Sequence, residues 1–161
     1  MPGYGVLGPH EGTGLLPWPD AERRLAASHD YWLASTWPDG RPHVMPVWGV
    51  WDGAGLWFSS SRRSRKIANL ERNPRCVMTT DDALDPVIIE GMAEVVTDGG
   101  GIRRFLARLN DKYGTDYAVD FLDPAVNATV RLTPRTAFAL LQSDFTGSPT
   151  RWTFDVPASG R

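Results

Sequence analysis

Turn signals divide this chain into short strand-like segments about every 8–12 residues, and this spacing limits the folds open to it. Pro38-Asp39-Gly40 and Asp52-Gly53 are residue types that tight turns favour, and each separates two runs rich in β-branched and aromatic side chains. Such runs predict strands at residues 31–37, 43–51, 56–60, 75–80, 87–96, 128–132 and 137–142, with a short last strand at 151–154. Strands joined by short turns form antiparallel meanders, whereas a doubly wound sheet would need helices to alternate with strands.

Three segments carry helical signals instead. Pro17-Trp18-Pro19-Asp20 is typical of a helix start and predicts a short helix over residues 21–29. Residues 61–73 change to a helical period, and Asp98 can cap a third helix that Gly114 ends.

These elements together predict a mainly β protein of the α+β class: a single antiparallel barrel with helices at its openings. The barrel is expected to occupy residues 17–156. Residues 1–16 are rich in glycine and proline and are expected to be flexible. Gly91, inside the strand predicted at 87–96, is expected to mark a bulge or a close approach of another backbone.

Composition excludes several classes of function. The net charge of −2 disfavours a nucleic-acid-binding barrel, and no stretch is long and apolar enough to span a membrane. The N-terminus lacks the pattern of a signal peptide, and Cys76 is the one cysteine, so a reducing cytoplasm is the expected location. His10, His29 and His43 are scattered, which makes a metal site improbable.

The stretch from Ser59 to Lys66 carries the strongest chemical signal, because it lies where a strand is predicted to pass into a helix. Helix N-termini present unpaired N–H groups, and Ser59, Ser60, Ser64, Arg65 and Lys66 add hydroxyls and charge that suit a phosphate. A solvated basic helix start with a serine cap would look the same, so both interpretations stay open.

Pro46 is the second signal. Proline donates no ladder hydrogen bond, so its strand must be an edge or bulged there, and a backbone freed in this way can face a ligand ring. Met45, Trp48 and Trp57 are candidate pocket walls, with core packing as their alternative role. Because the sequence has no glycine-rich phosphate loop and no nucleophile elbow, any hard chemistry is expected to come from a cofactor.

The order and spacing of several short motifs resemble the pyridoxamine 5'-phosphate oxidase-like split-barrel superfamily, and more narrowly the actinobacterial flavin/deazaflavin oxidoreductases. The resemblance covers residues 18–154. The motifs are Pro38-Asp39-Gly40-Arg41-Pro42-His43, Pro46-Val47-Trp48, Leu56-Trp57-Phe58-Ser59, Ser64-Arg65-Lys66, Asn69-Leu70, Asn73-Pro74-Arg75, Glu90-Gly91, Ala93-Glu94 and Thr150-Arg151-Trp152-Thr153-Phe154.

The resemblance implies a homodimer of split β-barrels, each of six to eight antiparallel strands with flanking helices, and cofactors in grooves between the subunits. It places Met45, Pro46 and Val47 against the cofactor ring and Ser59 and Ser60 at the ribityl chain and ring edge. It assigns the phosphate to Ser64, Arg65 and Lys66. It brings the tail residues Arg151 and Trp152 near the cofactor, in some relatives from the partner chain.

The resemblance also implies oxidoreductase chemistry: transfer of a hydride between a flavin or deazaflavin and a small, apolar or conjugated organic substrate. The run Arg62, Arg63, Arg65 and Lys66 favours the deazaflavin coenzyme F-420, whose oligoglutamate tail adds negative charge, over FMN. Residues 151–161 hold no clear counterpart of the arginine- and histidine-containing substrate segment of pyridoxamine 5'-phosphate oxidases proper. The alternatives are an FMN-dependent oxidase or reductase, and a non-catalytic flavin- or haem-binding protein with His43 as the axial ligand.

Overall fold

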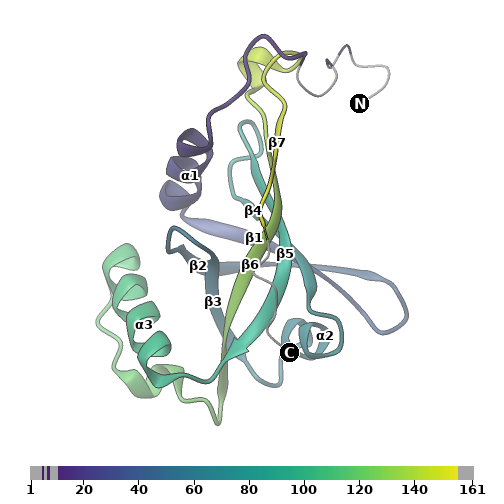
Figure 1. Cartoon of the computed structure of the whole chain (residues 1–161). Coiled ribbons are helices and arrows are strands. Elements are labelled where there is room, and N and C mark those ends of the chain that lie inside the picture. Colours follow the sequence, from purple (N-terminus) through teal and green to yellow (C-terminus); the bar gives the residue numbers. More distant parts are fainter. Residues whose placement is uncertain (1–4, 6, 8–10, 156–161) are drawn as a thin grey trace.

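The computed structural model describes residues 5, 7 and 11–155, and its strands form one antiparallel sheet in the order β3-β2-β1-β4-β5-β6-β7. The strands are β1 (Asp30–Thr36), β2 (Pro42–Trp51), β3 (Leu56–Ser61), β4 (Arg75–Thr80), β5 (Val87–Val96), β6 (Asn127–Ala139) and β7 (Thr150–Thr153). Because β3 also pairs with β6, six strands close into a barrel, and β7 extends the sheet beside the far end of β6 (Figure 1). The predicted mainly β, α+β split barrel is confirmed.

Alternating side chains fill the barrel. Leu33, Phe58, Met78, Ile89 and Val130 come from five different strands and are fully buried. Since successive side chains of a strand point to opposite faces, this alternation places one face of each strand in the core.

The barrel is split between β2 and β3. Along its first half, β2 pairs only with β1, whereas its pairing with β3 is confined to Gly49, Val50 and Trp51. Beyond that point β3 stays paired with β6 over residues 59–61. The first half of β2 and the end of β3 therefore each have a free edge, and Pro46 lies on that of β2, as predicted for an edge strand.

One strand prediction is wrong. The segments 128–132 and 137–142, predicted as two strands, belong to the single strand β6, and residues 140–142 lie outside it. Pro134 does not break the strand. It pairs with Gly91 beside a register shift, because Glu90 pairs with Thr136 and leaves Arg135 of β6 as the extra residue of a β-bulge. The prediction of a bulge or a close approach at Gly91 is confirmed: the register shifts beside Gly91, and the backbone of β6 lies close to it. A Cβ atom there would lie only 2.2 Å from the carbonyl oxygen of Thr133, so the close approach requires glycine.

Three α-helices flank the barrel: α1 (Trp18–Ala27), α2 (Arg65–Arg72) and α3 (Gly99–Tyr113). Two short 3-10 helices, η1 (Val119–Leu122) and η2 (Gln142–Asp144), lie in the connections. In Figure 1, α1 and α3 lie on one side of the barrel and α2 on the other. Among the described residues, no helix has the length and hydropathy needed to cross a membrane.

The helix ends follow their capping residues. Helix α3 begins after Asp98, whose carboxylate accepts hydrogen bonds from the N–H groups of Gly100 and Gly101, and it ends at Gly114 with φ of 62°, both as predicted. Helix α2 is shorter than the predicted 61–73, because Ser64 is its N-cap and the preceding residues form a turn.

The N-terminal segment was predicted to be flexible over residues 1–16, and most of its first ten residues lie outside the described residues, as does residue 156. In the described part, the N–H of Gly14 donates to the carbonyl of Gly147 and that of Leu16 to the hydroxyl of Thr150. Flexibility of the segment remains a prediction.

Candidate functional site

A cavity of about 340 Å³ lies where the barrel splits. Its walls come from both free strand edges and from α2, α3 and η1. The lining residues are Pro46, Val47, Trp48, Ser59, Ser60, Lys66, Phe105, Leu109, Phe121 and Asn127. Five of the ten predicted site residues are among them, and the volume falls at the lower end of the range of ligand pockets, about 300–1,000 Å³.

One end of this cavity is polar and positively charged. The Lys66 ammonium donates to the hydroxyl of Ser60 at 3.1 Å, and Ser60 donates to the hydroxyl of Ser64 at 3.2 Å. Ser64 in turn accepts from the N–H of Ile67 at 3.4 Å and so caps α2. The three predicted residues thus form one connected group where β3 leads into α2.

Lys66 has no carboxylate partner within ion-pair distance among the described residues. Burial lowers the pKa of its ammonium below the usual value. A half-buried cation without a counter-charge is costly, and an anion that enters the cavity would remove that cost. This end of the cavity therefore suits a phosphate or another anionic group.

The backbone of β2 supplies a second wall. The N–H of Gly49 donates to the hydroxyl of Tyr113 at 2.9 Å, and its carbonyl accepts from Lys112 at 2.7 Å, both on the side away from β3. Because backbone polar groups of successive strand residues point to opposite sides, those of Trp48 and Pro46 face the split. The carbonyl of Pro46 and both polar groups of Trp48 can therefore meet a ligand.

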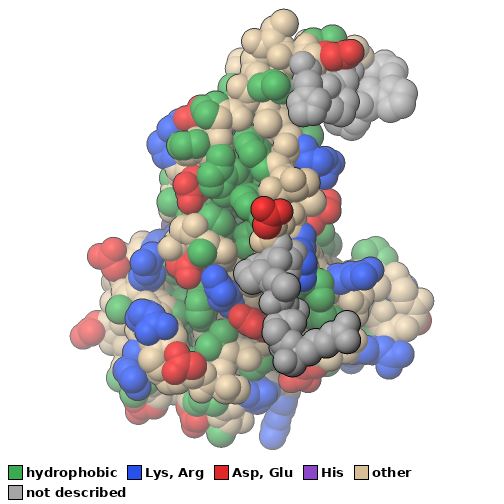
Figure 2. Space-filling model, viewed as in Figure 1, with side chains coloured by type: hydrophobic (Ala, Val, Ile, Leu, Met, Phe, Trp, Pro, Cys, Tyr) green, Lys and Arg blue, Asp and Glu red, His purple; other side chains and the backbone are tan. Residues whose placement is uncertain are grey.

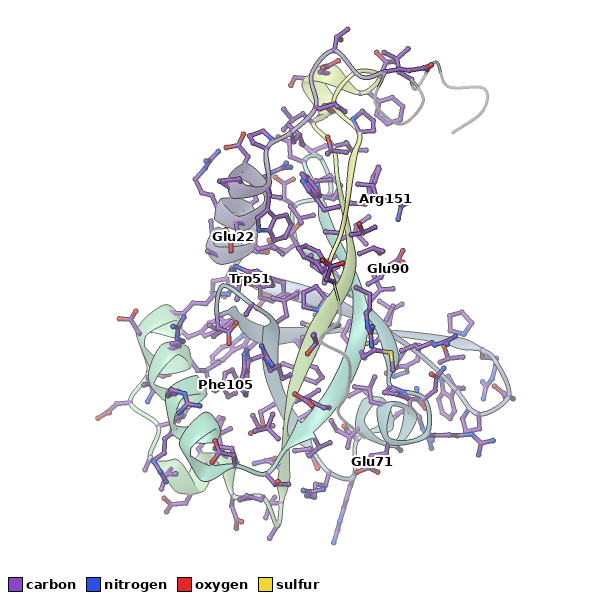
Figure 3. All side chains as sticks on the ribbon, in the orientation of Figure 1. Glu22, Trp51, Glu71, Glu90, Phe105 and Arg151 are labelled. Carbon is purple, nitrogen blue, oxygen red and sulfur yellow. The ribbon has the colours of Figure 1, made fainter. Side chains whose placement is uncertain are left out.

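The other end of the cavity is apolar. It is lined by Trp48, by Phe105 and Leu109 of α3, and by Phe121 of η1. Phe105 is labelled in Figure 3, where it lies between α3 and the barrel. The cavity is amphipathic as a whole, and it fits a flat ring whose attached chain ends in an anion.

The remaining predicted residues lie off the cavity wall. Met45 is exposed on β2, and the Arg65 guanidinium carbon lies 4.0 Å from the centre of the Trp37 ring. Trp152 packs edge-on against Trp18, with ring centres 5.4 Å apart.

Arg151 projects from β7 with its guanidinium carbon 5.6 Å from the ring centre of Phe138. Figure 3 shows Arg151 in the upper part of the molecule and Phe105 of the cavity in the lower part. Within one chain, the structure does not bring Arg151 or Trp152 to the cavity.

The four basic residues expected to attract an anionic cofactor, Arg62, Arg63, Arg65 and Lys66, have different surroundings in the structure. Arg62 donates to the carbonyl of Pro124 and lies 3.8 Å from the Glu71 carboxylate. Arg63 is exposed, and Lys66 is the one member of the run that lines the cavity.

Other candidate groups have structural partners. The Trp57 indole donates to Asp52 at 2.7 Å, and its ring stacks on Phe105. Trp57 is not among the residues that line the cavity. Burial raises the pKa of the Cys76 thiol to about 12, which leaves it protonated at neutral pH and a poor nucleophile. His43 Nδ1 lies 3.5 Å from Ser35 Oγ, and no cluster of potential metal ligands occurs in residues 5, 7 and 11–155.

A larger cavity, about 450 Å³, lies on the outer face of the sheet and is lined by residues such as Ala34, Val77 and Arg135. We favour the smaller cavity as the functional site, because two free strand edges meet there beside the Lys66 ammonium, which has no ion-pair partner in the part of the chain that the structure describes. Sequence reasoning missed Phe105, Leu109, Phe121 and Asn127. The helical spacing of Phe105 and Leu109 predicted burial only, and the one signal for Phe121 was an aromatic residue in a polar loop.

The solved structures similar to this chain include an F-420 reductase, a conserved hypothetical protein and a heme binding protein. The F-420 reductase is 28% identical, with a TM-score of 0.60, over 72% of this chain and 94% of the other. The conserved hypothetical protein, from Mycobacterium tuberculosis, is 24% identical, with a TM-score of 0.73, over 95% and 99%. The heme binding protein, from Mycobacterium smegmatis, is 21% identical, with a TM-score of 0.64, over 86% and 58%.

No curated protein matches the chain. Residues 18–141 match the family described as pyridoxamine 5'-phosphate oxidase, and this span includes the whole closed barrel and every residue that lines the candidate site. The chain belongs to the pyridoxamine 5'-phosphate oxidase family of split barrels.

Proposed function

We propose that this protein is a cytoplasmic, homodimeric oxidoreductase that binds coenzyme F-420 in the split cavity and acts on a small organic substrate. The observation that carries the proposal is the half-buried Lys66 ammonium, which has no carboxylate partner among the described residues and lies at the polar end of an amphipathic cavity. A ring-bearing cofactor with an anionic chain has the complementary shape and charge.

In this arrangement Lys66, Ser60 and Ser64 would hold the phosphate, and the free edge of β2 would meet the ring. Phe105 and Leu109, which are almost fully buried, exclude water from the apolar end. The bound cofactor would supply the hydride chemistry. The protein's part is to orient the ring, to neutralise the anion and to keep the reacting face dry.

The choice of F-420 over FMN rests on two points. The similar solved structure with the highest identity given above is an F-420 reductase, at 28% over most of both chains. Arg65 follows directly before Lys66 in the chain, lies over the Trp37 ring at 4.0 Å, and adds a second positive charge at the start of α2. An FMN-dependent oxidase or reductase on the same site is the alternative.

The homodimer is supported by an apolar outer face. Trp32 and Val44 are about half exposed on adjacent strands, and the register places Trp32 opposite Pro46. The same face includes Trp48 and so reaches the edge of the cavity. Exposed apolar patches of this kind mark interaction surfaces. A second copy packed here would border the site, and Arg151 faces outward on the same sheet.

The direct experiment is to purify the protein, release any bound chromophore and identify it by mass spectrometry. The ligand-free protein is then titrated with F-420, FMN and haem. F-420 bound in preference to the other two supports the proposal. FMN selects the oxidase or reductase alternative, and haem selects the non-catalytic binder with His43 as the residue to test. A protein that binds none of the three contradicts the proposed function.

A further inference from the structure

Two stacked aromatic pairs border the apolar end of the cavity. Trp48 stacks on Tyr113 with ring centres 4.2 Å apart and planes 6° from parallel, and Phe121 stacks on Tyr117 at 4.0 Å and 7°. Trp48 and Phe121 line the cavity, yet each is more than 40% exposed. Large rings left half in water at a cavity mouth mark a place where a ligand completes the packing.

Hydrogen bonds hold one residue of each pair in place. The hydroxyl of Tyr113 accepts from the N–H of Gly49 at 2.9 Å. The Asn110 side chain accepts from the N–H of Tyr117 at 3.1 Å and donates to its carbonyl at 3.0 Å. The Tyr113 ring and the backbone that carries the Tyr117 ring are therefore held before any ligand arrives, which lowers the entropic cost of binding against these pairs.

The segment that carries Phe121, residues 114–126, holds three acidic and no basic side chains. The acidic residues are the exposed Asp116, Asp120 and Asp123. The Lys112 ammonium lies 5.1 Å from the centre of the Tyr113 ring and donates to the carbonyl of Gly49. The basic side chains of the neighbouring helix face, Arg104 and Arg108, line a separate small cavity. An anionic molecule at the aromatic mouth would meet like charges, whereas the anion of the cofactor meets Lys66 at the opposite end.

We propose that Trp48 and Phe121 are specificity-determining residues that hold the second substrate, and that this substrate is a flat, uncharged ring compound. The inference rests on the proposed function, because it places the substrate beside a cofactor in the split cavity. It goes further in naming the residues that select the substrate and the charge that they exclude.

The test measures binding rather than turnover, with two matched, redox-inert probes: neutral 2-naphthol and anionic 2-naphthalenesulfonate. Equilibrium dialysis at pH 7 is performed on protein saturated with the cofactor that it binds. We expect 2-naphthol to bind about tenfold more tightly than the sulfonate, the scale of one aromatic contact or one like-charge repulsion.

Phe121→Ala and Trp48→Ala should each weaken 2-naphthol binding about tenfold, and Phe121→Leu should do so as well, because it keeps an apolar side chain but removes the flat ring. Phe121→Tyr keeps a flat ring and should bind 2-naphthol as tightly as the wild type does. Val119→Ala is the control, since Val119 is exposed on the same segment but does not line the cavity.

The failures of the two proposals are distinguishable. If the wild-type protein binds neither F-420 nor FMN, the proposed function fails. If the cofactor binds but 2-naphthol affinity is the same in the wild type, Phe121→Ala and Trp48→Ala, the aromatic pairs do not hold the substrate. Equal or tighter binding of the sulfonate would overturn the exclusion of anions.

Discussion

The guanidinium of Arg65 lies 4.0 Å from the centre of the Trp37 ring, whereas its neighbour Lys66 points into the split cavity. Consecutive residues at the start of α2 thus have different partners. Arg65 is exposed and stacked on an aromatic ring, while Lys66 is half-buried and hydrogen-bonded to Ser60. Two residues that a sequence motif groups together are expected to contribute unequally to cofactor binding.

Lys66→Ala should therefore weaken cofactor binding by about 1.5–3 kcal/mol, the scale of a charge-assisted hydrogen bond. Arg65→Ala should weaken it by less than about 1 kcal/mol, because its guanidinium lies outside the cavity and in a solvent-screened position. Fluorescence titration of both variants with F-420 and FMN measures the difference. Equal losses in the two variants would show that the phosphate is bound outside the cavity, over α2.

Gly49→Ala should destabilise the barrel by about 1–3 kcal/mol, the usual cost of overpacking. A Cβ atom at Gly49 would lie 2.9 Å from the carbonyl oxygen of Trp57 and 3.0 Å from Tyr31 Cδ2. Gly99→Ala is the matched control, because its Cβ would meet only the flexible side chain of Arg103 at 3.4 Å. Urea unfolding checks both, and equal stability of the two variants would show that β2 can move away from β3 at little cost.

The contribution of Lys112 to stability should rise with pH. Burial lowers the pKa of Lys112 to about 8, although Asp30 and Asp81 oppose this shift. Between that value and the unfolded pKa of about 10.4, the unfolded state binds more protons than the folded state, so the free energy of unfolding increases with pH. Lys112→Met removes this titration.

The free energy of unfolding of the wild type, minus that of Lys112→Met, should therefore be larger at pH 9.5 than at pH 7. Urea unfolding of both proteins at the two pH values measures it. A difference that shrinks over this range would mean that the pKa of Lys112 is not lowered in the folded state.

Trp32→Lys should convert the proposed homodimer to a monomer, because it places a charge on the apolar outer face next to Pro46. Val44→Lys on the adjacent strand should have the same effect and guards against a folding defect in one variant. Leu84→Lys, at a side chain 60% exposed between β4 and β5, is the control. Sedimentation velocity reports the mass of each variant. Dimers that persist in both Trp32→Lys and Val44→Lys would show that the interface lies on another face.

Much of the fold could be predicted from the sequence, because its signals are local. The strands at 75–80 and 87–96 have the predicted bounds, and Asp98 and Gly114 cap their helix as expected. The continuity of β6 was missed. Pro134 lies inside that strand next to a bulge at Arg135, opposite Glu90 and Gly91 of the neighbouring strand, and such a pairing between distant residues leaves no local pattern.

The site could be predicted only in part, for the same reason. Pro46, Val47, Ser59, Ser60 and Lys66 lie near one another because two adjacent strands and the following helix bring them together. The apolar end depends on how α3 and η1 pack across the barrel, which helical spacing does not specify. Trp152, near the end of the chain, packs on Trp18 at the start of α1. The spacing of residues along the sequence does not predict a contact between two residues so far apart.

The molecular surface shows basic and acidic side chains interspersed over the lower part of the face seen in Figure 2, so the overall field there does not select a ligand. Selection is expected to come from the split cavity itself. The central claim is that an anion enters the cavity and meets Lys66, and a crystal structure with bound F-420 or FMN tests it most directly. We predict the phosphate within hydrogen-bond distance of Lys66 Nζ and Ser60 Oγ, with the ring against the backbone of Pro46 and Trp48 at the free edge of β2. A phosphate bound at any other place, with the Lys66 ammonium left without an anion, would contradict it.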